Sequence, residues 1–121
     1  MKLDRLAPLL ALAEVAQSAE QARLHSLNKE IARIRQQLEA LNPGAPDLAT
    51  HAALPPVTLM RWQNWIDQRR EALNRDLAMA LARQDTQLAR MRHAFGRASA
   101  LQKLMEKEHR SAAQREARRA D

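Results

Sequence analysis

The chain contains no cysteine and no tyrosine, and only two of its 121 residues are glycine. Without cysteine it has no disulfide framework and no cysteine-ligated zinc or iron–sulfur site. Aromatic residues make up 2% of the sequence, too few for the core of a β-sandwich or β-barrel. These absences favour an all-α fold, and the length predicts a single domain, residues 1–121.

Motifs for catalysis are also missing. No two of the four histidines lie three to five residues apart, so they lack the spacing of a metal site. The sequence has no glycine-rich phosphate loop and no nucleophile elbow. We therefore expect a protein that is not an enzyme and that binds no cofactor and no metal.

Long hydrophobic runs are absent too. A membrane-spanning helix needs about 18 consecutive apolar residues, and no stretch approaches this. Residues 6–13 resemble a weak signal peptide, but Pro8 interrupts them and an amphipathic pattern continues through them. We expect a retained helix rather than a cleaved signal, and a cytoplasmic location.

What the chain does contain is a composition typical of long helices and coiled coils, rich in alanine, leucine, arginine, glutamine and glutamate. In the first third, apolar residues alternate spacings of three and four residues. The seam positions predicted there are Leu3, Leu6, Leu10, Ala13, Gln17, Glu20, Leu24, Leu27, Ile31, Ile34, Leu38 and Leu41. This pattern predicts a coiled-coil helix over about residues 4–41.

Four of the five prolines fall within residues 42–56 and predict a loop there. Pro55 and Pro56 suit the start of a second helix, expected over about residues 57–118. Its predicted seam is Trp62, Ile66, Leu73, Leu77, Leu81, Gln84, Leu88, Met91, Phe95, Ala98, Leu101 and Met105. The four-residue steps from Leu73 to Leu81 predict a stutter that locally unwinds the supercoil.

Two long helices joined by a short loop predict an antiparallel coiled-coil hairpin. A fold centred near Ala49 pairs positions whose numbers sum to roughly 98, with Leu3 near Phe95 and Leu41 near Val57. The second helix then extends 20–25 residues past the first, a C-terminal overhang of ~35 Å.

The polar interruptions of the two seams fall at a similar level in this pairing. Gln17 and Glu20 face the region close to Gln84, which predicts a polar layer that fixes register. Gly96 lies where the first helix runs out. It is either a small residue tolerated under close packing or a soft joint between the shaft and the overhang.

Residues 96–121 include seven basic and four acidic residues. The interspersed acids argue against a nucleic-acid stripe, and the usual interpretation is a solvated helix face. Leu101, Leu104 and Met105, however, have no first-helix partner in the predicted pairing. Unpaired apolar positions on a charged helix indicate insertion into another protein.

Trp62 and Trp65 lie three residues apart beside the loop. One interpretation is that they cap the hairpin core by packing on Leu38 and Leu41. The other is a partner-contact patch, because tryptophan is enriched in binding hot spots. In either case Trp65 is expected to be the more exposed of the two.

Three segments resemble the FliJ-type stalk proteins of flagellar type III export. Residues 3–14 are similar to the leucine-rich start of that family. Residues 61–66 (RWQNWI) resemble its aromatic-glutamine start of the second helix, and residues 101–110 (LQKLMEKEHR) resemble its closing pattern. The stalk proteins of virulence secretion systems share this architecture.

The resemblance implies a central stalk that enters a hexameric export ATPase ring, contacts the export gate membrane protein and escorts export chaperones. It implies a location at the cytoplasmic face of the inner membrane, held there through partners. The residues it suggests for the ATPase ring are Leu3, Arg5, Arg97, Leu101, Lys103, Leu104, Lys107 and Arg110. Those it suggests for the gate or chaperones are Trp62, Trp65 and Arg69.

Two other functions fit the sequence. A generic coiled-coil adaptor or homo-oligomeric tether would self-associate through these seams instead of forming a hairpin within one chain. A basic-helix nucleic-acid binder would show affinity that falls steeply with salt, and the interspersed acids disfavour it.

Overall fold

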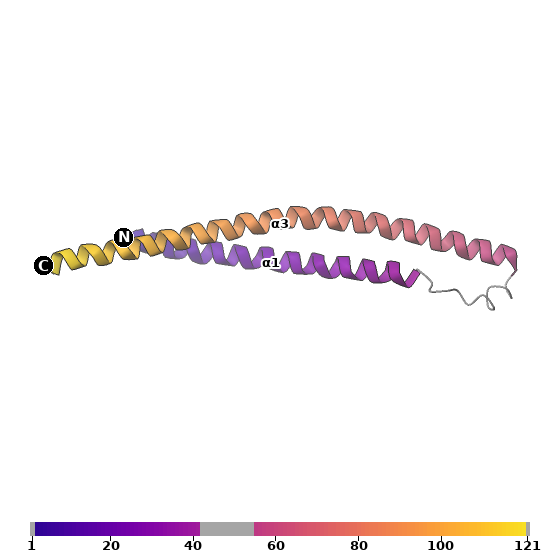
Figure 1. Cartoon of the computed structure of the whole chain (residues 1–121), viewed down its shortest axis with the longest axis horizontal. Coiled ribbons are helices and arrows are strands. Elements are labelled where there is room, and N and C mark those ends of the chain that lie inside the picture. The colour runs from indigo at the N-terminus through magenta and orange to yellow at the C-terminus, as the bar shows by residue number, and fades with distance from the viewer. Residues whose placement is uncertain (1, 42–54, 121) are drawn as a thin grey trace. The chain divides into compact units, whose positions relative to one another are not determined.

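A computed structural model describes residues 2–41 and 55–120 of the chain (Figure 1). These residues form two helices, α1 (Lys2–Leu41) and α3 (Pro56–Ala120). The predicted all-α fold with a longer second helix is confirmed, and no strand occurs in the described ranges. The predicted loop at 42–56 lies almost wholly outside them.

The helix ends follow from local sequence. Asn42 precedes Pro43, a position from which the helical conformation is disfavoured, and α1 ends at Leu41. Arg70 Nη2 donates a hydrogen bond of 3.3 Å to the Leu41 carbonyl oxygen, so a cation on the other helix satisfies one of the terminal acceptors. α3 starts at Pro56. Proline lacks a backbone N–H, but the first N–H groups of a helix have no partner within the helix, so nothing is lost there.

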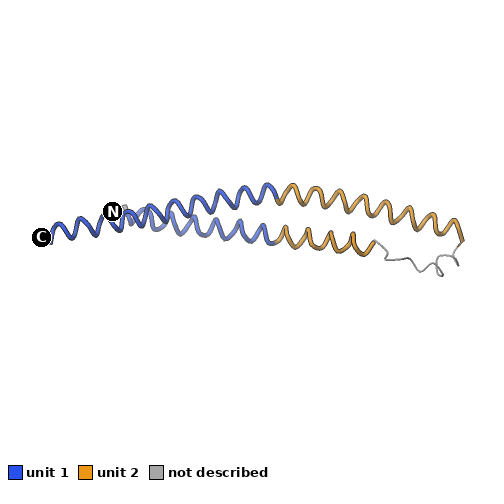
Figure 2. Tube along the Cα trace, in the orientation of Figure 1, with its two compact units in different colours: residues 1–25, 85–121 blue, residues 26–84 orange. Residues whose placement is uncertain are grey.

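The chain forms two compact units, each made of one segment from each helix (Figure 2). Unit 1 comprises residues 1–25 and 85–121, and unit 2 comprises residues 26–84. Within each unit the two helical segments run antiparallel, as the hairpin prediction requires.

The seam of α1 agrees with its prediction at every position. All twelve predicted residues are buried or half-buried, from Leu3 to Leu41. Ala13, Ile31 and Ile34 are the most deeply buried among them. The three-and-four spacing of α1 therefore identified the contact face of this helix.

The predicted seam of α3 needs correction. Many of its buried and half-buried residues follow an unbroken three-and-four repeat: Ile66, Arg70, Leu73, Leu77, Ala80, Gln84, Gln87, Met91, Ala94, Ala98, Leu101, Met105 and Glu108. The predicted Leu81 and Leu88 are half-buried beside this repeat. The predicted stutter is wrong, because Ala80, only 1% exposed, continues the repeat, but Leu81 beside it is half-buried and packs against the same core as predicted. Trp62 and Phe95 are wrong as seam residues, since both are exposed.

The register prediction is also wrong. In unit 2 the Arg70 side chain meets Leu41, and these numbers sum to 111 rather than the roughly 98 expected from a hairpin centred near Ala49. Leu41 therefore lies far from Val57, and the first turns of α3 begin beyond the end of α1. A hairpin centre placed midway along the loop caused the error.

In unit 1 the Gln87 side chain meets Glu20, and these numbers sum to 107, so Leu3 lies level with residues beyond Phe95 instead of Phe95 itself. Residues 109–120 of α3 therefore continue past the start of α1, and the overhang is shorter than the predicted ~35 Å. Leu101 and Met105 are half-buried in the seam, so the expectation that they lack first-helix partners is wrong.

Gly96 lies inside the paired part of unit 1 and not where α1 runs out, as the shifted register shows. A Cβ built at Gly96 would meet no atom within 4 Å. The prediction of close packing is therefore wrong, and the predicted joint position at the end of α1 is wrong as well. The helix continues through this residue without interruption.

Candidate protein-interaction surface

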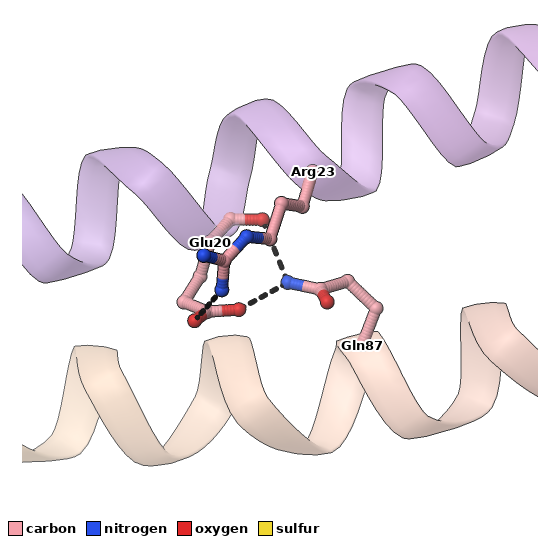
Figure 3. A network of polar contacts seen from close by, with 3 residues as sticks. All are labelled: Glu20, Arg23 and Gln87. Carbon is pink, nitrogen blue, oxygen red and sulfur yellow. Dashed lines mark hydrogen bonds and ion pairs between the residues drawn. The ribbon is translucent and has the colours of Figure 1, made fainter.

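A polar layer interrupts the seam of unit 1 (Figure 3). Gln87, 6% exposed, donates through Nε2 to the Glu20 carbonyl oxygen at 3.0 Å and also to the Glu20 carboxylate. Arg23 donates to the same carboxylate at 2.8 Å. The predicted polar layer at Glu20 is confirmed, but its partner is Gln87 and not Gln84. Gln84 instead donates to Asn28 in unit 2, at 2.8 Å.

The seam of unit 1 leaves a shallow groove along one side of the paired helices, with a volume of about 390 Å³. Four of the residues that line it are alanines. The groove is lined by Ala13, Ala16, Glu20, Ala89, Arg90, His93, Ala94 and Arg97. Arg97 donates to His93 Nε2 at 3.1 Å, which holds both side chains along the edge of the groove.

The heptad repeat sorts the other residues of unit 1 onto two sides of the seam. One side, here called the basic side, holds Arg5, Leu9, Leu12, Ala16, Arg23, Arg90, Arg97, Leu104 and Lys107. The opposite side, here called the acidic side, holds Asp4, Glu14, Asp85, Arg92, Phe95 and Glu106. Basic residues therefore gather on one side of this unit and acidic residues on the other. The total numbers of acids and bases in the unit do not reveal this separation.

The basic side also exposes large apolar side chains. Leu9, Leu12 and Leu104 are 50%, 68% and 48% exposed. Leu9 of α1 and Leu104 of α3 share this side and lie beyond the same end of the alanine-lined groove. A cluster of exposed leucines next to a groove is typical of a protein-binding surface rather than of a solvated coiled-coil flank.

The corresponding groove of unit 2 differs in chemistry. It has a volume of about 310 Å³, and its lining includes both acids and bases: Glu30, Arg33, Ile34, Gln37, Arg69, Leu73, Asp76, Met79 and Arg83. Mixed charge of this kind is the ordinary surface of a soluble coiled coil.

The residues suggested for the ATPase ring do not form one surface. Arg5, Arg97, Leu104 and Lys107 lie together on the basic side. Leu3 and Leu101 are half-buried in the seam, and Lys103 points away from it. Of these residues, Arg110 alone lies within residues 109–120, the part of α3 that continues past the start of α1.

The residues suggested for the gate or chaperones lie in unit 2. Trp62, Trp65 and Arg69 are exposed, and their spacing of three and then four residues places them on one side of α3. The predicted packing of the tryptophans on Leu38 and Leu41 is wrong, because Leu41 lies level with Arg70. Trp65 is the more exposed, at 57% against 38% for Trp62, as predicted.

Sequence reasoning missed Leu9, Leu12 and Arg90 as surface candidates. Their signal was present as a second apolar row, Leu9, Leu12 and Ala16, parallel to the seam of α1. A short apolar row beside a full heptad is easily assigned to the same core, and the pairing of α1 with α3 is needed to set it beside Arg90 and Arg97.

Among residues 2–41 and 55–120, no group of three or more His, Asp or Glu side chains is arranged to hold a metal ion. Neither α1 nor α3, over its described length, is apolar enough to span a lipid bilayer. Comparison of the chain with protein-family models, with curated proteins and with solved structures gives no significant match.

Proposed function

We propose that this chain is a non-enzymatic stalk protein of a type III protein export apparatus, of the FliJ type. The observation that carries the proposal is the end of unit 1 where α1 begins and residues 109–120 of α3 continue past it (Figure 1). That segment carries Arg110, Arg115, Arg118 and Arg119 against a single acid among its described residues, Glu116.

In this role the overhang and the adjacent paired helices enter a hexameric ATPase ring, and electrostatic attraction to an acidic lumen orients them. The exposed row Trp62, Trp65 and Arg69 offers a separate contact for the export gate or for export chaperones. The protein then works at the cytoplasmic face of the inner membrane, held there by these partners.

The test uses the purified chain and a hexameric export ATPase with nucleotide. Light scattering should show the ATPase shifting toward a hexamer, and its hydrolysis rate should rise. Arg110→Glu reverses one charge in the overhang and should weaken both effects. Arg75→Glu makes the same change on an exposed face of unit 2 and should leave both unchanged. A chain that neither binds the ATPase nor alters hydrolysis would refute the proposal.

A generic coiled-coil adaptor is the second candidate, and the exposed Leu9 and Leu12 favour it. An adaptor would bind a helical protein other than the ATPase and leave ATP hydrolysis unchanged. A homo-oligomeric tether would instead sediment as a dimer or larger species when alone.

A further inference from the structure

We propose that the basic side of unit 1 is a docking surface for an acidic amphipathic helix of a partner protein, which adds a third helix to this unit. This inference does not rest on the export role. It is based on the exposed leucines, the groove beside them and the positive charges that surround both.

The shape of the surface selects a helix. Leu9, Leu12 and Ala16 follow a spacing of three and four residues along α1, so they form a ridge parallel to the groove. Because Ala16, Ala89 and Ala94 have small side chains, the groove has room for the side chains of a partner. A third helix laid along it can insert large apolar side chains between the two existing helices, as in helix-in-groove recognition.

The charge of the surface selects acidic flanks on that helix. Arg90 and Arg97 border the groove on α3. The one carboxylate at the groove, Glu20, already accepts bonds from Arg23 and Gln87 and cannot neutralise them as well. Acidic residues beside the apolar stripe of an incoming helix would pair with these arginines and set its position.

A second copy of this chain is a poorer occupant. A two-fold dimer through the basic side would place arginines of one copy against arginines of the other. If the basic side of one copy docked onto the acidic side of another, opposite charges would meet. Such a head-to-tail contact, however, leaves a free basic side and a free acidic side in every dimer and does not form a closed complex. The acidic partner helix satisfies both shape and charge in a closed one-to-one complex.

The probe is a synthetic peptide of three heptads with two leucines in each heptad and glutamate at the flanking positions. The comparison peptide carries lysine in place of glutamate. Fluorescence anisotropy of each labelled peptide, titrated with the full chain, measures affinity. We expect the acidic peptide to bind at least about tenfold more tightly than the lysine peptide at low salt, with the difference shrinking as salt rises.

Two pairs of variants locate the site. Arg90→Glu with Arg97→Glu should weaken binding of the acidic peptide about tenfold, while Arg75→Glu with Arg92→Glu, which makes the same charge change elsewhere, should have little effect. Leu12→Ser should also weaken binding, whereas Phe95→Ser on the acidic side should not. Circular dichroism checks that each variant keeps its helicity.

Three results would overturn the inference. The first is equal affinity for the acidic and lysine peptides. The second is an equal loss of binding in the two charge variants, or in Leu12→Ser and Phe95→Ser. The third is a stable dimer of the chain alone that Leu12→Ser dissociates, which would identify the surface as a contact between copies.

Discussion

The two units use the same heptad spacing but fill it differently. The buried seam residues of unit 2 are Ile31, Ile34, Ile66, Leu73 and Ala80, whereas those of unit 1 are Ala13, Gln87 and Ala98. Around its buried residues unit 2 adds half-buried leucines to a continuous core, including Leu38, Leu41 and Leu77. Unit 1 instead exposes leucines outside its seam, at Leu9, Leu12 and Leu104.

The difference indicates that one unit mainly stabilises the pairing of the helices and the other mainly offers a binding surface. Each buried methylene contributes about 0.8 kcal/mol, so an alanine in the seam stabilises the pairing much less than a leucine there. Unit 2 therefore holds the hairpin by apolar burial. Unit 1 is a weaker pair whose remaining apolar surface stays available to a partner, and the proposed docking of an acidic helix uses it.

The largest expected effect is a cavity in the core of unit 2. Leu73 is 2% exposed and packs with Ile31 and Ile34. Leu73→Ala should lower the free energy of unfolding by about 3 kcal/mol, as measured by urea denaturation. Leu101→Ala in the seam of unit 1 removes the same atoms from a half-buried site and should cost about 1 kcal/mol. Equal losses at the two sites would remove the proposed contrast between the units.

The polar layer of unit 1 gives the next effect. Gln87→Ala removes the hydrogen bonds from a buried donor to the Glu20 carbonyl and carboxylate and should cost about 1.5 kcal/mol. Gln84→Ala in unit 2 removes an exposed hydrogen bond to Asn28 and should cost less than about 0.5 kcal/mol. Thermal unfolding followed by circular dichroism measures both variants. A larger loss for Gln84→Ala would contradict the importance of this layer.

A third change should strengthen unit 1. Gly96 is exposed inside a helix and has space for a Cβ, so Gly96→Ala should stabilise the chain by about 1 kcal/mol. The reverse change at a nearby exposed position, Ala100→Gly, should destabilise it by a similar amount. Urea denaturation tests both, and a loss of stability in Gly96→Ala would mean that the residue is held in another conformation.

The smallest effect is expected at an exposed ion pair of unit 2. Arg75 Nη2 lies 3.5 Å from the Glu71 carboxylate, and both side chains are mostly exposed. Arg75→Ala should change the free energy of unfolding by less than about 0.3 kcal/mol. A larger change, measured by urea denaturation, would show that surface charge and not the aliphatic seam stabilises unit 2.

The seam of α1 could be read from the sequence because nearly all its positions are leucine, isoleucine or alanine. The seam of α3 could not, because Arg70, Ala80, Gln87 and Ala94 occupy seam positions while larger apolar residues stand next to them. Residue size therefore drew the prediction toward Leu81 and Phe95. Strict spacing counted from Ile66 would have placed Ala80 and Ala94 correctly.

The register and the candidate surface were harder to predict for a different reason. Heptads on two helices match one another at many offsets, and each offset puts apolar residues opposite apolar residues. The polar contacts select the observed pairing, with Gln87 at Glu20 and Arg70 at Leu41. The heptad repeat puts Leu9, Arg90 and Arg97 on one side, but the register sets their levels along the helices, so no pattern within either helix could join them into one surface.

Hydrogen exchange measured by mass spectrometry, with the chain alone and with the acidic peptide, tests most directly whether unit 1 is the weaker pair that a partner helix completes. We predict faster exchange in residues 8–25 and 86–104 than in residues 30–41 and 66–84, and slowing by the peptide only in the first two segments. Equal exchange in the two units, or peptide protection confined to residues 30–41 and 66–84, would contradict the account.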